Sequence, residues 1–426
     1  MIPLILKKDE LIGPGKNTSL NINGLLRFVE RQGFICNRQF GFRAKSGTDL
    51  AAATLFYHLA SIDKRAIATL TCLDLSSAFF CITYDNLRNL FDKISEGNAQ
   101  RFLHQLLLPR YGVMMGEGGP TDKFQIPSCG TAQGEPTSPI IFIMAMSGCL
   151  NYTLDSKDPN TPQQGKNATM FADDMQLICH AMSVAAAIEQ TYRVVDRCKE
   201  YTTNCGFRIN NLKSEITIFG NPKLAKEFPE IFQSPAGPIK RKREVDVLGI
   251  RVTDKLDFKP QIEHIIGKCE WHARNIKRIK KYAIKKHILR VLFSVMMGSI
   301  NYGLGIMPQW TVEQYKAAQS KLCAAIRYVL NIGQVQNQKI PDRILLKKVG
   351  ILPIHIQHQR MSLMTLNRVY TNQKPADLYN IINDHLEKPS NWSPGVCNLE
   401  ARINLSGPKI REATEKTMDS TSRSLK

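Results

Sequence analysis

Short runs of residues typical of β-strands alternate with helical runs between residues 66 and 258, and no other feature constrains the fold as much. The β-type runs are ATLTCLDL, the pair ATMF and QLICH around an Ala-Asp-Asp turn, FRIN, ITIF and VDVLGIRV. A helical run at 183–201 places Val184, Ile188, Tyr192 and Val195 on one face. Strands that alternate with helices predict an α+β or α/β core.

Basic residues dominate the helical sequence after residue 258. Between Lys268 and Arg290, nine Lys and Arg residues face one acid, Glu270, for a net charge of 9 − 1 = +8. The whole chain carries 57 Lys and Arg against 37 Asp and Glu, or +20, and 43% of its residues are hydrophobic. A folded protein with this charge is expected to bind a polyanion. The basic helix therefore predicts contact with a nucleic-acid backbone, with a solvated helix face as the alternative.

Neither membrane insertion nor secretion is predicted. The longest apolar stretch, Pro139–Leu150, is shorter than the roughly 18 to 20 residues that cross a bilayer, so it predicts a buried helix. The N-terminal segment places its apolar residues before its lysines, which is the reverse of a signal peptide. We therefore expect an intracellular protein, in the nucleus or the cytoplasm, with no membrane partner and no obligate protein partner.

Cysteine spacing argues against disulfide and zinc sites. Eleven scattered cysteines without a CxxC pair predict reduced core residues. Cys269 and His272, with His264 nearby, form only half of a zinc site, so a basic helix is the simpler interpretation. The KRKR run at 240–243 has two open interpretations, a nuclear localisation signal or a basic loop near a primer strand.

Three carboxylates lie at the ends of β-type runs. Asp74 ends ATLTCLD, and Asp173 and Asp174 form the turn between MF and MQLI. A strand end beside a hairpin turn can bring carboxylates close together, and such oxygen ligands suit Mg²⁺. A pair of Mg²⁺ ions can activate a hydroxyl and stabilise a leaving phosphate oxygen, so the arrangement indicates nucleotidyl transfer.

Six segments occur in a diagnostic order. They are QFGFRAKSGTD, LDLSSAFFCITYDNL, CGTAQGEPTSPIIF, FADDMQLI, GFRINNLKSEITIFG and VLGIRVTDKLDFKPQIEHI. In order and spacing they resemble the successive blocks of reverse transcriptases, most closely those of the non-LTR (LINE-type) retrotransposon branch. The resemblance covers residues 39–264 well and continues more faintly to about residue 350.

The resemblance implies a fold and a domain order. The fold is α+β (α/β): a right-hand polymerase whose ferredoxin-like palm combines an antiparallel sheet with helices. Residues 1–65 would form partial fingers, and residues 66–258 the palm, with a fingers contribution near 93–128. Residues 259–350 would form a helical, basic thumb, and residues 351–426 a C-terminal helical extension and polar tail.

The resemblance also implies roles for individual residues. Asp74, Asp173 and Asp174 would be the catalytic residues that hold two Mg²⁺ ions, with Mn²⁺ as an alternative. The 3′-hydroxyl of a DNA primer would attack the α-phosphate of a dNTP on an RNA template. The nucleotide would contact Arg43, Leu75 through its carbonyl, Phe79, Gln133, Gly134 and Lys213. Primer and template would contact Pro136, Ser138, Leu248, Gly249, Lys277, Arg278 and Lys281.

Physical reasons accompany four of these roles, and each has a purely structural alternative. Phe79 is bulky enough to clash with a 2′-hydroxyl, but it can also be a core residue. The Arg43 guanidinium suits a triphosphate, although a surface arginine is equally simple. Ser138 can cap a helix that begins at Pro139. Lys213 can donate a proton to pyrophosphate or remain a solvated loop residue.

Position 79 also bears on whether the product is DNA or RNA. Viral RNA-dependent RNA polymerases resemble this palm, but they usually carry an acidic residue five places after the first Asp and Gly-Asp-Asp at the hairpin. Here these places hold Phe79 and Ala172. DNA synthesis is therefore favoured.

Two departures from the family pattern leave a second function open. Phe80 stands where the family usually has Asp, and the Arg-Pro-Ile-Ser-type block expected before QFGFR is absent. No endonuclease motif or zinc knuckle is evident, so we expect an excised or degenerate piece of a larger element protein. The first hypothesis is an RNA-directed DNA polymerase, and the alternative is a catalytically inactive, truncated remnant that only binds nucleic acid. A membrane-surface protein that uses the helix at 268–290 is disfavoured because no sustained apolar stripe opposes the lysines.

Overall fold

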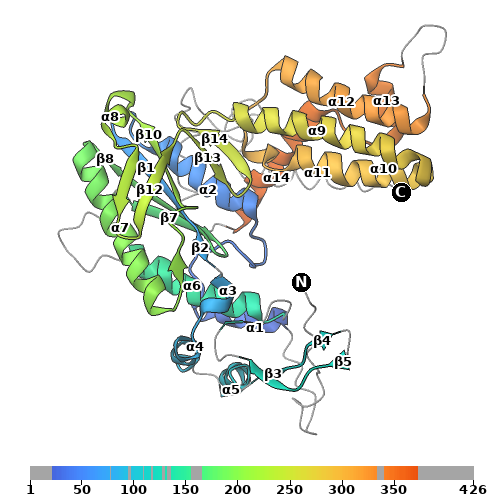
Figure 1. The fold of residues 1–426 in the computed structure, drawn as a ribbon. Helices are drawn as coiled ribbons and strands as arrows, with labels where there is room; N and C mark the ends of the chain where they lie inside the picture. The colour runs from blue at the N-terminus through green and yellow to red at the C-terminus, as the bar shows by residue number, and fades with distance from the viewer. Residues whose placement is uncertain are drawn as a thin grey trace.

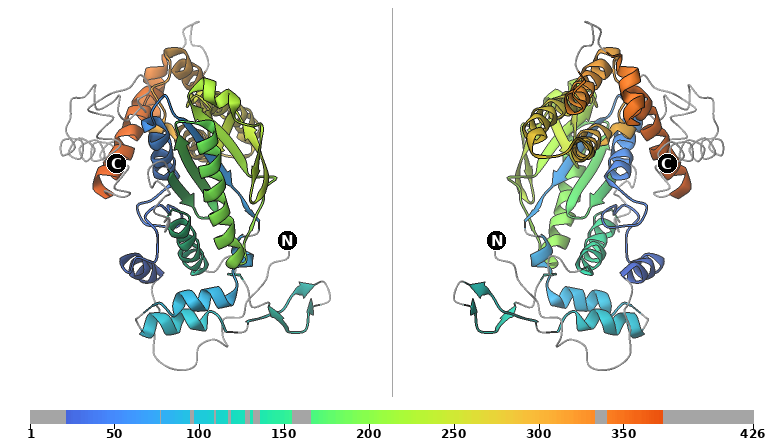
Figure 2. Two further views of the ribbon diagram at one scale, coloured as in Figure 1. Left: turned by 90° about the vertical axis from the view of Figure 1, so that its left-hand side faces the viewer. Right: turned by 90° about the vertical axis from the view of Figure 1, so that its right-hand side faces the viewer.

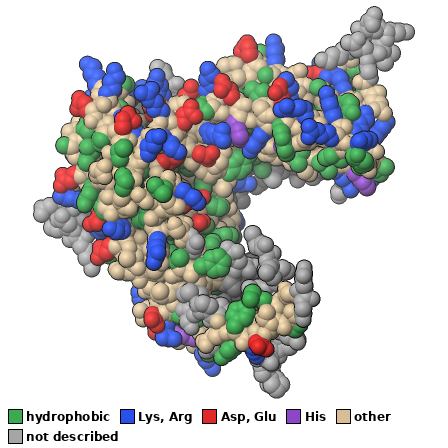
Figure 3. Space-filling view, in the orientation of Figure 1, with side chains coloured by type: hydrophobic (Ala, Val, Ile, Leu, Met, Phe, Trp, Pro, Cys, Tyr) green, Lys and Arg blue, Asp and Glu red, His purple; other side chains and the backbone are tan. Residues whose placement is uncertain are grey.

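The computed structural model describes residues 22–76, 78–94, 97–108, 110–116, 119–126, 130–131, 136–154, 166–332 and 340–372. A mixed sheet with flanking helices forms the centre of the molecule (Figure 1). Helices α9 to α14 extend to one side of this centre, and α4, α5 and the strands β3 to β6 lie on another. Between these two groups the surface is hollowed (Figure 3).

A six-stranded sheet with the order β11-β12-β10-β1-β8-β7 positions the three aspartates of the motifs at one end. Its strands are β1 (Ile67–Leu73), β7 (Lys166–Phe171), β8 (Asp174–Ala181), β10 (Glu215–Gly220), β11 (Ile231–Ser234) and β12 (Gly237–Lys242). All neighbouring strands are antiparallel except β10 and β12, which are parallel. Residues 240–242 of the KRKR run belong to β12, so the basic-loop interpretation of this run is wrong.

Alternate residues of the sheet enter two different cores, as the pleat of a strand requires. Leu70, Ile178 and Phe219 pack with α2 (Thr48–Ser61) and the C-terminal helices. Ile67, Leu177, Ile216 and their same-face neighbours pack with α6 (Ser138–Leu154) and α7 (Val184–Asn204). Figure 2 shows α7 lying across one face of the sheet. Helices on both faces bury every residue of the central strand β1 except Cys72, which is partly buried.

The predicted face of α7 is correct at Val184, Ile188 and Val195, which pack against the core, and wrong at Tyr192. Ser183 caps the helix by accepting a hydrogen bond from the Ala186 N–H at 3.3 Å. The buried positions are Ala187, Thr191, Val194, Val195, Cys198 and Thr202, whereas Tyr192 is 47% exposed. Thr191 lies inside because its hydroxyl bonds the Thr69 hydroxyl of β1 at 2.7 Å. A buried polar contact, which hydrophobicity alone cannot reveal, sets the orientation of the helix.

Smaller elements surround the central sheet. They are α1 (Ile22–Arg31), β2 (Leu75–Ser76), α3 (Ala78–Cys81), α4 (Tyr84–Phe91), α5 (Gly97–Gln105), β3 (Arg110–Gly112), β4 (Met115–Gly116), β5 (Gly119–Pro120), β6 (Phe124–Ile126), β9 (Arg208–Ile209) and α8 (Pro222–Glu227). Helix α4 buries Leu87 and Phe91. Strands β2 and β9 pair with each other just beyond Asp74.

A hairpin and a run of helices follow the sheet, and the last strand ends at Thr253, close to the predicted limit. The hairpin consists of β13 (Glu244–Val247) and β14 (Ile250–Thr253). The helices are α9 (Lys259–Ile279), η1 (Lys280–Tyr282), α10 (Lys285–Leu292), the π-turn η2 (Phe293–Met297), α11 (Gly298–Asn301), η3 (Leu304–Ile306), α12 (Val312–Leu330), α13 (Asp342–Val349) and α14 (Ile354–Asn372). Helix α14 contacts α2, α12 and η3, so it joins the helical group to the sheet.

One described stretch, Lys285–Ile306, is long and apolar enough to cross a membrane by length and composition alone, with a mean hydropathy of 1.3. The other long apolar stretch, Pro139–Leu150, lies in α6 and is mostly buried, as predicted. In the structure, 285–306 is divided among α10, η2, α11 and η3. Ile288, Leu292, Met296 and Ile300 face the helical core at intervals of four residues.

Candidate active site

Three aspartates meet where β1 ends and the β7–β8 hairpin turns. The ladder between β1 and β8 ends at the pair Leu73↔Met175, so Asp74 leaves β1 beside the start of β8 at Asp174. Phe171 pairs with Asp174 across the hairpin, and Ala172 and Asp173 form its turn. Ala172 has a φ of +58°, in the left-handed region. Sheet topology thus brings together residues that are 100 positions apart in the sequence.

The pKa values of Asp173 and Asp174 are both raised. Burial is the largest cause that raises the pKa of Asp174 to about 6, and the negative charges of Asp173, Asp74 and Asp246 add to it. Burial also raises the pKa of Asp173, again with a contribution from Asp74. Like charges that are partly removed from water favour a bound cation or a proton. The turn is therefore a concentrated negative site.

The donor set fits Mg²⁺ when substrate supplies further ligands. Within the described ranges, no three His, Cys, Asp or Glu side chains stand ready as a closed metal cage. Mg²⁺ typically takes one or two carboxylates and completes its shell with water and substrate phosphates. Asp74, Asp173 and Asp174 are oxygen ligands of this kind.

Asp246 is a fourth carboxylate near the turn, and sequence reasoning missed it. It lies on β13, opposite Arg251 of β14, and the two side chains approach to 3.5 Å. Its charge acts on Asp174. The only sequence signal was its place two residues before Leu248.

A loop holds the backbone of Asp74 from both sides. The Asn210 N–H donates to the Asp74 carbonyl at 2.8 Å, and the Asp74 N–H donates to the Ser214 hydroxyl at 3.2 Å. The same hydroxyl donates to the Asn210 carbonyl at 2.8 Å, which closes the ring of contacts. Lys213 projects from this loop into solvent. The role predicted for Lys213 stays a prediction.

The Phe79 side chain is partly buried and packs against other aromatic rings. Its ring stacks on Phe142 of α6 with a centroid distance of 4.2 Å, and its carbonyl accepts from the Thr131 N–H at 2.8 Å. Phe42 approaches it edge-on at 6.4 Å. Leu75, next to Asp74, buries its side chain within the pair β2–β9. Phe80, which occupies the unusual position, is 54% exposed.

The turn of the β13–β14 hairpin contains Leu248 and Gly249. Their φ values of +52° and +78° are those of a type I′ turn. The Tyr302 hydroxyl, at the end of α11, donates to the Leu248 carbonyl. A Cβ on Gly249 would lie 3.2 Å from the Tyr302 ring, so glycine also allows this close approach. Tyr302 is a second residue that sequence reasoning missed.

Comparison with known proteins agrees with this geometry. The model of the family "Reverse transcriptase (RNA-dependent DNA polymerase)" matches residues 19–252, more than half of the chain. The chain belongs to the reverse transcriptase family. The predicted reverse transcriptase fold, an α+β palm with helical elements, is confirmed.

Solved structures similar to this reverse transcriptase include two telomerases in complex with the TWJ fragment of telomeric RNA. The Candida albicans protein has 10% identity and a TM-score of 0.44, and the match covers 86% of this chain and 53% of that one. The Candida tropicalis protein has 12% identity and a TM-score of 0.43, with 94% and 57% coverage. The chain thus spans a little over half the length of these proteins. No curated protein matches it.

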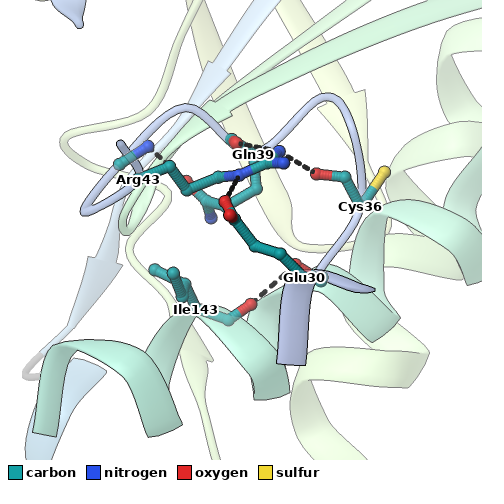
Figure 4. Close-up of polar contacts among 7 residues, drawn as sticks. Glu30, Cys36, Gln39, Arg43 and Ile143 are labelled. Carbon is teal, nitrogen blue, oxygen red and sulfur yellow. Dashed lines mark hydrogen bonds and ion pairs between the residues drawn. The ribbon is translucent and has the colours of Figure 1, made fainter. Parts of the chain in front are cut away.

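Arg43 makes internal contacts in this reverse transcriptase. Its guanidinium donates to Glu30 at 2.8 Å and to the carbonyls of Cys36 and Gln39 at 2.9 and 3.0 Å. The side chain is only 11% exposed and turns inward (Figure 4). These contacts use the Nε and Nη1 groups and brace the loop at 36–43. A triphosphate contact of Arg43 stays a prediction.

The predicted template loop is described only in part. Gln133 and Gly134 lie outside the described residues. Pro136 is exposed, and Ser138 is buried as the first residue of α6. The helix therefore begins one residue before the predicted start at Pro139, and the Thr137 carbonyl accepts from the N–H groups of Ile140 and Ile141.

The predicted basic residues of the helical group, Lys277, Arg278 and Lys281, are all exposed. Lys281 lies 4.7 Å from the ring centroid of Tyr282. Lys277 lies 5.7 Å from the ring centroid of Tyr328, and Lys280 lies 4.0 Å from it and also bonds Asn331. Tyr328 therefore holds two of the lysines against α12. Figure 3 shows the blue side chains gathered on this helical group.

Proposed function

We propose that this chain is the RNA-directed DNA polymerase of a non-LTR (LINE-type) retrotransposon. It would extend a DNA primer with dNTPs on an RNA template and use two Mg²⁺ ions, with Mn²⁺ as an alternative. The observation that carries the proposal is the meeting of Asp74, Asp173 and Asp174 at one end of the sheet in a reverse transcriptase family member.

Asp74 and Asp173 would hold the metal ions, with Asp174 as a weaker ligand. When bound, Mg²⁺ would acidify the primer hydroxyl and neutralise charge on the departing pyrophosphate. The carboxylates contribute the negative field that draws divalent cations to the turn. The loop at 210–214 fixes the position of Asp74, because it holds the Asp74 backbone by two hydrogen bonds.

Other residues of the chain would bind and orient the substrates. Phe79, braced on Phe142, would exclude a 2′-hydroxyl from the nucleotide site. Lys213 would give a proton to pyrophosphate. The Leu248–Gly249 turn, held by Tyr302, would support the primer strand. The exposed Arg278 and Lys281 would contact the phosphate backbone of the duplex.

Primer extension tests the proposal. Purified protein is incubated with poly(rA), an oligo(dT) primer, labelled dTTP and either Mg²⁺ or Mn²⁺, beside Asp173→Asn. Asp196→Asn, which removes an exposed carboxylate on α7, is the matched control. We expect extension by the unmodified and control proteins and almost none by Asp173→Asn. Failure of the unmodified chain under both metals contradicts enzyme activity, and equal extension by Asp173→Asn contradicts the site.

The retrotransposon assignment rests on the resemblance of the six ordered segments. It is tested by the genomic sequence on both sides of the coding region. An endonuclease reading frame in continuity with the chain supports a non-LTR element. A flanking protease and integrase would contradict it.

A second candidate is a catalytically inactive remnant that only binds nucleic acid. The inward-facing Arg43 favours it, because its Nε and Nη1 groups donate to Glu30, Cys36 and Gln39 of the protein itself. This candidate predicts tight binding of the template–primer by the unmodified chain without extension. Fluorescence anisotropy with the same duplex separates binding from catalysis.

A further inference from the structure

The turn that carries Asp173 has an unfavourable backbone conformation. Ala172, immediately before Asp173, has a φ of +58°, although alanine gains nothing from the left-handed region. Such a residue stays in place only when its surroundings hold it. The contacts of Ala172 therefore decide where the catalytic carboxylates lie.

One side chain satisfies both backbone groups of Ala172. The Oε1 atom of Gln39 accepts from the Ala172 N–H at 2.9 Å, and the Nε2 group of Gln39 donates to the Ala172 carbonyl at 3.2 Å. The Gln39 side chain is completely buried, and Oε1 also accepts from the Gly41 N–H at 2.9 Å. In a water-free site these bonds have no substitute, so loss of the amide leaves the turn unsatisfied.

The segment around Gln39 follows the hairpin as a short extra strand. Gln39 forms a parallel bridge with Met170. The Phe40 N–H donates to the Met170 carbonyl at 2.8 Å, and the Met170 N–H donates to the Arg38 carbonyl at 3.0 Å. A Cβ on Gly41 would lie 2.4 Å from the Ala172 nitrogen, so only glycine permits this approach.

Arg43 supports Gln39 from the other side. It donates to the Gln39 carbonyl at 3.0 Å while it is paired with Glu30 of α1 (Figure 4). A continuous series of contacts thus runs from Glu30 through Arg43 and Gln39 to Ala172. Its last member is bonded covalently to Asp173.

We propose that Gln39 is a positioning residue that fixes the Ala172–Asp174 turn and thereby the metal-binding carboxylates. The inference rests on the proposed function for the identity of the bound metal. It gives the N-terminal segment a structural part in the active site. Arg43 acts in the same series, through Gln39.

The test replaces Gln39 with methionine, which keeps the length of the side chain and removes all three hydrogen bonds. Gln176→Met is the matched control, because Gln176 is a buried glutamine of the same hairpin that bonds Thr169 at 3.0 Å and not the turn. Gly41→Ala is a second variant, which presses on Ala172 while Gln39 remains. Circular dichroism and thermal melts establish that each protein is folded at the assay temperature.

The primary readout is Mn²⁺ binding to the full chain, measured by electron paramagnetic resonance. We expect Gln39→Met and Gly41→Ala to weaken Mn²⁺ binding by about 10- to 100-fold, as outer partners of metal ligands do, and Gln176→Met to change it less than about threefold. In primer extension, kcat should fall similarly while the KM for dTTP changes little. A residue that only stabilised the fold would lower the melting temperature without altering Mn²⁺ binding.

The outcomes separate this inference from the proposed function. Weaker Mn²⁺ binding by both turn variants supports the inference even if the unmodified chain extends no primer. Extension by the unmodified chain with equal Mn²⁺ binding by Gln39→Met and Gln176→Met overturns the inference and leaves the function standing. Absence of Mn²⁺ binding by the unmodified chain overturns it as well.

Discussion

Asp174 carries a charge that the protein alone does not balance. Its folded pKa of about 6 lies above the ordinary value of 3.8, so folding disfavours the ionised form. This cost develops as the pH rises from about 4 to 6, and it is complete above that range. We therefore expect Asp174→Asn to stabilise the metal-free protein at pH 7.5 by about 1 kcal/mol, allowing for solvent screening.

Thermal melts in EDTA measure this effect. The difference between Asp174→Asn and the unmodified chain should vanish near pH 4, where both are uncharged at this position. Asp196→Asn, on the exposed side of α7, should show no difference at any pH. A lower melting temperature for Asp174→Asn at pH 7.5 would mean that the carboxylates do not repel one another.

We expect the Phe79 side chain to select dNTPs over rNTPs. Its stacking on Phe142 prevents the ring from moving away, so a 2′-hydroxyl in its path should be rejected. We expect Phe79→Ala to raise the incorporation of rNTPs relative to dNTPs by about tenfold or more. Single-nucleotide extension with dTTP and UTP measures the ratio. Phe80→Ala, at the exposed neighbouring position, should leave the ratio unchanged, and a similar change there would remove Phe79 from its role.

At the scale of elements, a buried histidine joins three helical segments. His358 of α14 lies 2.7 Å from the Tyr315 hydroxyl of α12 and 3.1 Å from the Met307 carbonyl that follows η3. Burial lowers the pKa of His358 to about 4, against a smaller opposing effect of the Met307 carbonyl. The histidine is therefore neutral in the folded protein. Its contribution to stability is present above about pH 6.5 and is lost as the pH falls towards 4.

The lowered pKa of His358 predicts that the helical group around α14 loses stability in acid. When the pH falls from 7.5 to 5, the free energy of unfolding should decrease by about 2 kcal/mol because of His358. His358→Gln should lose correspondingly less stability over this range, although it is less stable at pH 7.5. His355→Gln, on the exposed side of the same helix, is the control. Urea titrations at the two pH values measure the difference, and equal acid sensitivity of all three proteins would exclude His358 as its source.

At the scale of the whole molecule, positive and negative charge lie on different parts of the chain. The helical residues 268–290 carry a net charge of +8, and the three aspartates lie at the end of the central sheet. Each lysine or arginine that contacts a phosphate releases about one counterion. We expect the double change Arg278→Gln, Lys281→Gln to reduce the salt dependence of template–primer binding by about two in log–log slope.

Lys280→Gln is the matched control for this charge effect. Lys280 is bonded to Tyr328 and Asn331, so it is committed to the protein and should alter the slope much less. Fluorescence anisotropy over a range of KCl concentrations measures the slopes. Equal slopes for the double variant and the unmodified chain would place the duplex elsewhere.

The sequence by itself determined the alternation of strands and helices, the end of the sheet near residue 258 and the places of Asp74, Asp173 and Asp174 along the chain. These features depend on local periodicity and on motif order, and both are visible directly in the amino-acid sequence. The run VDVLGIRV, predicted as β-type, is in the structure a hairpin of two strands, because Leu248 and Gly249 adopt the left-handed pair of a tight turn.

Only the tertiary structure decided which residues hold that site in place. Gln39 reaches Ala172 across 133 positions, and the Asp74 N–H reaches Ser214 across 140, because the sheet places β10, β1, β8 and β7 side by side. Arg43, a predicted phosphate ligand, also braces its own loop through Glu30 and the Cys36 carbonyl, partners that appear only after folding. Partners of buried polar groups are set by the order of strands in space, which local sequence does not encode.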